Sequence, residues 1–185
     1  MALPICYNSV VIISYFIICL IILILNYLSK GKINRFLMLQ RGSIINPMTY
    51  LRLFTSSCCH DGWSHFKNNF LIILIVGPML EEKYGSITLL KMMLIICIFT
   101  GIIHLIISKR PAIGASNITF MFIALSSVVN ISEGKVPITL LLVFLFYVVD
   151  EIIKAITRRK DNIGHDAHII GAICGFIFGY FGINF

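Results

Sequence analysis

Long apolar runs separated by short polar segments dominate the pattern of this chain. A helix rises 1.5 Å per residue, so about 20 apolar residues cross the hydrocarbon of a bilayer. Backbone groups in hydrocarbon must be paired internally, so runs of this length predict helices. The pattern therefore predicts an all-α integral membrane fold with six spans. They lie at roughly 9–28, 67–82, 86–107, 114–130, 137–153 and 164–184.

The second, fourth and fifth runs are short for a complete crossing of the bilayer. Short runs that carry polar residues indicate helices inside a bundle, with ends that stop below the lipid surface. The first run is too long for the core of a cleaved signal peptide, so it is interpreted as a span.

One connection, residues 29–66, is much longer than the others, and a connection of this length is usually functional or disordered. Its aliphatic and aromatic content argues against disorder. Within it, the segment 33–40 mixes apolar and polar residues as a helix lying in the membrane interface does. No internal repeat or second domain is visible, so residues 1–185 are expected to form one membrane domain.

Composition supports a membrane protein. Hydrophobic residues make up 58% of the chain and charged residues 12%, against about 45–50% and 25% in soluble domains. The net charge of +7 could suggest nucleic acid. The basic residues lie between apolar runs, however, so lipid head groups and topology explain them better, and no nucleic-acid partner is expected.

Ser116 begins the fourth apolar run, in the sequence "IGASNITF". A buried hydroxyl needs a partner, because leaving it unpaired costs on the order of 1–3 kcal/mol. A lone serine in a span is often only a packing residue whose hydroxyl bonds the preceding turn. The chemistry of Ser116 therefore depends on what faces it.

His168 opens the sixth run and shares a helical face with Gly171, Gly175 and Gly179, at offsets of 3, 7 and 11. Glycines at four-residue spacing allow a neighbouring helix to approach closely. Packing alone could account for this face, but a histidine on it needs a hydrogen-bond partner. Ser116 is expected at a similar depth, and a serine beside an imidazole forms an activated nucleophile.

The segment "HDGWSHFKNN" opens the second run and puts His65 and Asn69 on one helical face. Two such donors can stabilise an oxyanion, although a polar helix start in the interface would have the same pattern. A metal site was also considered, but no standard ligand spacing occurs and none is predicted. The candidate ligands were Cys58, Cys59, His60, Asp61 and His65.

Together these segments resemble the rhomboid intramembrane serine proteases. "LRLFTSSCCHDGWSHFKNN" resembles the family's loop and second-span segment, and "GPMLEEKYGS" resembles its Glu-x-x-x-Gly-Ser motif. "GASN" is similar to Gly-x-Ser-Gly, and "AHIIGAICG" matches Ala-His-x-x-Gly-x-x-x-Gly completely. The four motifs occur in the family's order and cover most of the chain.

The resemblance implies a six-helix bundle that cleaves single-span membrane proteins in the lipid bilayer without a metal or other cofactor. Ser116 would be the nucleophile and His168 the general base. The backbone N–H of Ser116, with His65 and Asn69, would form the oxyanion hole. Supporting positions would be Gly114, Asn117, Phe120, Gly171 and Gly175, with Phe120 stacked on the histidine. Structural positions would be Arg52, His60, Glu81 and Gly85. Asp166, two residues from His168 on the helix, would point elsewhere.

Asn117 departs from the pattern, because the family has glycine there. Its side chain would narrow the substrate cavity or add an oxyanion donor. It also leaves open a rhomboid-like pseudoprotease that binds membrane clients. A small transporter or channel is a further alternative, but that class would carry ionisable residues deep in several spans, whereas here they cluster at one end.

The side of the membrane on which the site opens stays undecided. The family's usual topology conflicts with the positive-inside tendency, because it puts most basic residues outside. Those outside would be Lys30, Lys32, Arg35, Arg41, Arg52, Lys67, Lys109, Arg110, Lys154, Arg158, Arg159 and Lys160, against Lys83, Lys91 and Lys135 inside. The minimal form and Ile-, Lys- and Asn-rich usage suggest a bacterial inner membrane. The sequence does not indicate the substrate or the oligomeric state.

Overall fold

The computed structural model describes residues 9–42, 45–128, 134–135, 138–157 and 165–181, and these are helical except for connections. In chain order, the helices are α1 (Val10–Leu28), α2 (Lys32–Leu37), α3 (Pro47–Thr55), the 3-10 turn η1 (Ser56–Cys58), α4 (Trp63–Tyr84), α5 (Ser86–Ile107), α6 (Ser116–Val128), α7 (Ile138–Ile156) and α8 (His165–Tyr180). Within these residues, the only β pairing is an isolated antiparallel bridge between Leu39 and Ala112.

The six longer helices in the described part of the chain overlap the six predicted runs. Two of them, α1 and α5, are long and apolar enough to cross a membrane by length and composition. The largest difference is at α4, which begins at Trp63, four residues before the predicted start. Hydropathy placed this start too late, because the residues of α4 before position 67 include the polar side chains of Ser64 and His65. The segment 33–40, predicted to form a helix in the membrane interface, overlaps the short helix α2.

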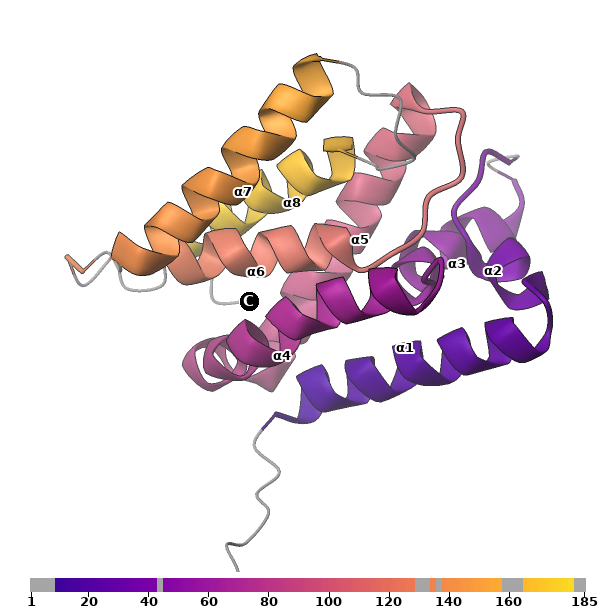
Figure 1. Ribbon diagram of the computed structural model, residues 1–185, viewed down its shortest axis with the longest axis horizontal. Coiled ribbons are helices and arrows are strands. Elements are labelled where there is room, and N and C mark those ends of the chain that lie inside the picture. The colour runs from indigo at the N-terminus through magenta and orange to yellow at the C-terminus, as the bar shows by residue number, and fades with distance from the viewer. Residues whose placement is uncertain (1–8, 43–44, 129–133, 136–137, 158–164, 182–185) are drawn as a thin grey trace, which may run out of the picture.

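Helix α6 occupies the centre of the bundle, with α4 on one side and α7 and α8 on the other (Figure 1). Residues 117–128 of α6 are all buried. Its 13 residues extend for only about 20 Å, less than the roughly 30 Å thickness of a hydrocarbon core. At least one end of α6 therefore lies below the surface of the core.

Helices α6 and α8 run parallel and lie unusually close together. A Cβ atom added to Gly171 would overlap the carbonyl oxygen of Asn117, and one added to Gly175 would overlap that of Met121. These pairs follow each other in the same direction along both helices. The glycine face predicted for the sixth run therefore packs directly on the α6 backbone, and it holds the first turns of the two helices level.

A buried carboxylate joins three helices at the end of α4 distant from His65. Glu81 is 4% exposed, and its two oxygens accept hydrogen bonds from the N–H groups of Val11 and Ile12 at 3.0 and 3.1 Å. The Ser86 hydroxyl donates to the same carboxylate at 2.6 Å. Glu81 thus caps the start of α1 and ties α1 to α4 and α5, beside the positive-φ Gly85.

Replacing Glu81 by alanine should lower the free energy of unfolding by about 2 kcal/mol, because it leaves buried donors without a charged acceptor. Denaturation of the detergent-solubilised protein measures the change. Glu82→Ala is the matched control, since Glu82 is the exposed neighbour and should change stability by less than about 0.5 kcal/mol. Equal effects of the two substitutions would contradict the capping role.

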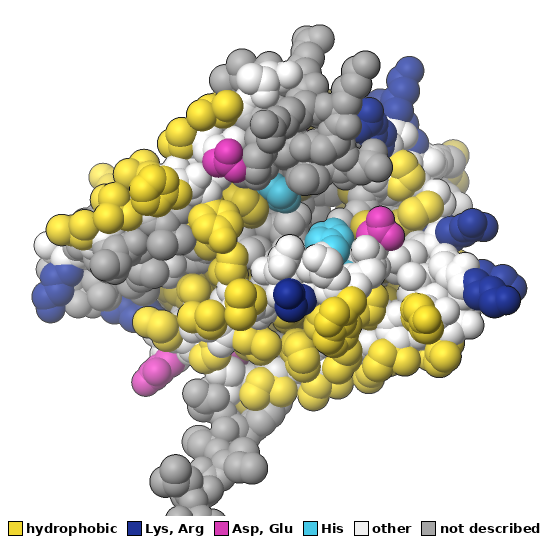
Figure 2. All heavy atoms as spheres, in the orientation of Figure 1, with side chains coloured by type: hydrophobic (Ala, Val, Ile, Leu, Met, Phe, Trp, Pro, Cys, Tyr) yellow, Lys and Arg dark blue, Asp and Glu magenta, His cyan; other side chains and the backbone are white. Residues whose placement is uncertain are grey.

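The long connection between α1 and α4 is anchored to the bundle. Arg52 Nε donates to the Phe36 carbonyl at 2.9 Å and so ties α3 to α2. The Tyr15 hydroxyl donates to the Ser57 carbonyl at 2.7 Å and so ties α1 to η1. Figure 2 shows hydrophobic side chains along the lower edge of the bundle, with most Lys and Arg at its two sides and a basic side chain near the middle of the view. This distribution fits a bundle whose apolar face meets lipid.

Candidate active site

Ser116 is the first residue of α6 and lies half-buried at the end of the segment that follows α5. Gly114, two residues earlier, has φ of +116°, a conformation that L side chains rarely adopt, so glycine lets the chain turn into the helix. Its N–H donates to the Ser56 carbonyl at 3.0 Å. The N–H groups in the first turn of a helix have no intrahelical acceptor, so that of Ser116 is placed to bind an anion.

His168 lies in the first turn of α8, beside the start of α6. Its imidazole stacks on the Phe120 ring with centroids 4.4 Å apart and planes 10° apart. Phe120 is one turn after Ser116, and Gly171, one turn after His168, contacts the Asn117 backbone. Both contacts put Ser116 and His168 at the same level of two parallel helices.

His65 and Asn69 project from α4 over Gly114. A Cβ atom on Gly114 would lie 2.6 Å from His65 Nε2 and 3.8 Å from Asn69 Nδ2, so only glycine fits beneath them. Asn69 Oδ1 lies 3.3 Å from the Thr119 hydroxyl, whose proton is shared with the Ala115 carbonyl oxygen at 3.1 Å, and the amide nitrogen is on the other side. That nitrogen is buried and has no hydrogen-bond partner in the described residues. The arrangement can therefore offer a side-chain donor close to the backbone that leads into Ser116.

A family model described as the Rhomboid domain matches residues 47–185, which is most of the chain. The chain belongs to the rhomboid family. Rhomboids act on membrane-protein substrates in the lipid bilayer, and the family includes serine intramembrane proteases and pseudoproteases. Membership of this family and the long apolar helices α1 and α5 together indicate an integral membrane protein. No curated protein sequence matches this chain.

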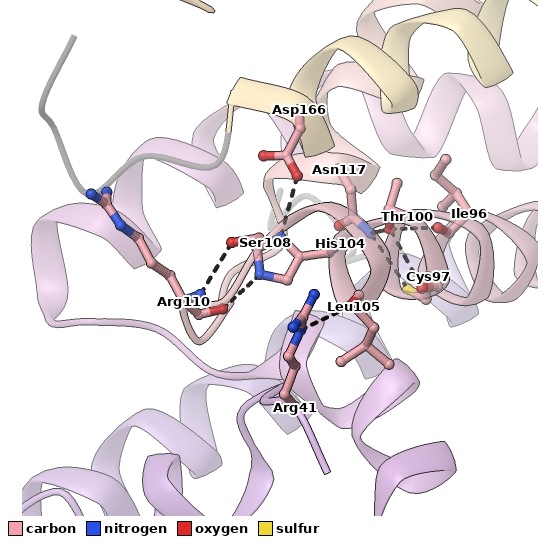
Figure 3. Close-up of polar contacts among 10 residues, drawn as sticks. All are labelled: Arg41, Ile96, Cys97, Thr100, His104, Leu105, Ser108, Arg110, Asn117 and Asp166. Atoms are coloured by element: carbon pink, nitrogen blue, oxygen red, sulfur yellow. Dashed lines mark hydrogen bonds and ion pairs between the residues drawn. The ribbon is translucent and has the colours of Figure 1, made fainter. Parts of the chain in front are cut away.

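Asn117 of this rhomboid has a buried amide that is turned toward α5, where Nδ2 donates to the Thr100 hydroxyl at 2.9 Å (Figure 3). Its Oδ1 accepts from the Ile118 N–H at 2.9 Å. Both polar atoms of the amide therefore have partners inside the bundle, which argues against this side chain as an additional oxyanion donor.

His60 packs inside the rhomboid beneath His65, fully buried against Phe66 and Phe70. Burial, with a smaller effect from the neighbouring His65, lowers the pKa of His60 to about 4. The ring is therefore neutral at neutral pH, and it supports the position of His65 by packing. Among the described residues, no group of three or more His, Cys, Asp or Glu side chains is arranged to hold a metal ion.

The sequence analysis missed His104, which lies near the end of α5 and is 7% exposed. Its Nδ1 is 3.2 Å from Asp166 Oδ2, so Asp166 has a partner of its own on α5. The available signal was a single imidazole inside an apolar run, which is costly in a membrane unless it is paired. Its partner is 62 residues away in the sequence, and no local pattern identifies it.

Proposed function

We propose that this rhomboid is an intramembrane serine endopeptidase that cleaves single-span membrane proteins within or near their spans. The observation that carries the proposal is the His168 ring stacked on Phe120, one helical turn from Ser116. His168 would take the Ser116 hydroxyl proton as the oxygen attacks the peptide carbonyl, and would then protonate the leaving amine. No cofactor enters this chemistry.

The oxyanion of the tetrahedral intermediate would be stabilised by Asn69 Nδ2, His65 and the backbone N–H of Ser116. The buried Asn69 nitrogen has no hydrogen-bond acceptor among the described residues, and this supports the role. A buried donor without an acceptor lowers the stability of the fold, and a bound oxyanion would supply that acceptor. Preorganised donors of this kind act only where charge develops in the transition state, so they raise kcat rather than substrate affinity.

The proposal extends to architecture. Residues 1–185 would form one rhomboid domain with α1, α4, α5, α6, α7 and α8 as its six spans and the connection 29–62 beside the membrane. The short α6 supports a site below the lipid surface that water reaches from one face. Substrate would enter laterally near the long connection and α7. A bacterial inner membrane is the proposed location, on the basis of the minimal form and amino-acid usage.

The second candidate is a pseudoprotease that binds membrane clients, and the observation in its favour is Asn117 at the family's glycine position. The orientation of the Asn117 amide toward Thr100 weakens that argument, because the polar atoms of the side chain are engaged with Thr100 and the Ile118 N–H. A pseudoprotease also has no physical need for a histidine stacked beside the serine, such as His168, or for a buried amide donor without an acceptor, such as Asn69.

Labelling with a fluorophosphonate distinguishes the two candidates, because the probe reacts covalently only with an activated serine. The folded wild type should label and cleave a model single-span substrate in liposomes, and Ser116→Ala should do neither. Ser127→Ala is the control, since it removes a buried hydroxyl farther along the same helix. A folded wild type that neither labels nor cleaves would support client binding instead.

A further inference from the structure

One imidazole joins three parts of the molecule beside the proposed dyad (Figure 3). His104 Nδ1 lies 3.2 Å from the Asp166 carboxylate in the first turn of α8. His104 Nε2 lies 2.8 Å from the Arg110 carbonyl oxygen, in the segment that leads from α5 to Ser116. The ring is therefore held at both nitrogens, and it connects the end of α5 to the elements that carry Ser116 and His168.

The two partners determine how many protons the ring carries. A backbone carbonyl can only accept, so Nε2 carries a proton. An ionised carboxylate can also only accept, so Nδ1 carries a second one. The Asp166 side chain is 28% exposed, and this contact with water favours the ionised carboxylate over a neutral acid. Geometry thus points to an imidazolium paired with a carboxylate, which binds more strongly than a neutral pair.

The bridge acts on both halves of the dyad. Asp166 is two residues before His168 in the same helical turn, so its anchor fixes the start of α8. Arg110 begins the segment that ends at Gly114 and Ser116. The Leu39–Ala112 bridge and the Gly114–Ser56 hydrogen bond bind that segment to the long connection. His104 ties it to α8, through the Arg110 carbonyl on one side of the ring and Asp166 on the other.

We propose that His104 and Asp166 are positioning residues, which hold Ser116 and His168 in register through this charged bridge. Neither side chain touches the reacting atoms. The inference rests on the proposed protease function for its catalytic consequence, although the bridge itself can be detected without any activity. A misplacement of about 1 Å between reacting groups can cost roughly 10²-fold in rate.

Asp166→Ala and His104→Ala should each lower kcat for cleavage, and the rate of fluorophosphonate labelling, by roughly 10- to 100-fold with little change in KM. Asp166→Asn is the conservative variant, because its amide oxygen still accepts from Nδ1–H, and it should lose less than Asp166→Ala. The double alanine variant should be no worse than either single one, since both break one bridge. Ser127→Ala serves as the control for losing a buried polar group.

Nitrogen-15 NMR of the histidines gives a readout that a merely structural role would not change. The chain has five histidines, so each signal can be assigned with single variants. Wild-type His104 should show two protonated nitrogens at neutral pH. Asp166→Ala should shift the signals of His168, because its ring would move relative to the face of Phe120.

The outcomes separate the two proposals. A neutral His104 in the wild type would overturn the bridge, and so would an Asp166→Ala variant with unchanged His168 signals. Unchanged kcat and labelling in Asp166→Ala, with an active wild type, would overturn the positioning role. A folded wild type without Ser116-dependent labelling would overturn the protease function alone, and the NMR signals would still decide the bridge.

Discussion

Replacing His168 by alanine should reduce cleavage of a single-span substrate by at least about 10³-fold, to the level that oxyanion stabilisation and binding alone supply. The reason is that the Ser116 hydroxyl is a weak nucleophile unless a base takes its proton, and His168 is the imidazole at its level. The measurement is initial cleavage rate in liposomes, with folding checked by thermal denaturation of each variant.

The comparison with Ser116→Ala makes the test sharper. Residues that act as a unit give non-additive losses, so the double variant should be no slower than either single variant. Ser127→Ala is the control, because it removes a buried hydroxyl farther along α6 and should keep most activity. Cleavage within tenfold of wild type in His168→Ala would show that another group is the base.

Replacing Asn69 by alanine should lower kcat by about 10²–10³-fold while KM changes little, because one preorganised oxyanion donor is lost. The Asn69 nitrogen is buried and has no hydrogen-bond partner in the described residues, while its oxygen lies 3.3 Å from the Thr119 hydroxyl. The donor side of the amide is therefore available. Kinetics of liposome-reconstituted protein over a range of substrate concentrations separate kcat from KM.

Asn68 offers the matched control for this prediction. It is the adjacent residue of the same type and is exposed, so Asn68→Ala should leave kcat within about twofold. Asn69→Asp should be at least as slow as Asn69→Ala, since it replaces the donor with a negatively charged acceptor. A rise in KM with unchanged kcat would instead assign Asn69 to substrate binding.

Much of the helix order could be predicted from the sequence, because hydrophobic runs in a membrane protein have few alternatives to helices. The start of α4 could not be predicted in this way, because its polar residues have the low hydropathy that is typical of a connection between helices. The motif around Ser116 and the glycine face after His168 predicted that the two segments would meet. Their common level is visible in the contacts of Phe120 and Gly171.

Two features of the site depend on contacts that no local pattern contains. The direction of the Asn117 amide is set by Thr100, which lies 17 residues earlier on another helix. The pairing of His104 with Asp166 joins α5 to α8 and depends on how closely α8 packs on the bundle. Asn117 and Asp166 could be singled out in the sequence, but their partners Thr100 and His104 could not be identified from it.

Two hydrogen bonds between Leu39 and Ala112, at 3.0 and 2.9 Å, join the long connection to the segment that leads from α5 to Ser116. A displacement of one of these two segments is therefore transmitted to the other. Helix α2 ends two residues before Leu39, and Ala112 is four residues before Ser116. Thinning or thickening of the bilayer changes the forces on elements at its surface. Lateral pressure on α2 would therefore reach Ser116 along a few residues of chain. Under the proposed protease function, lipid composition is then expected to change the rate of peptide-bond cleavage without any lipid touching Ser116.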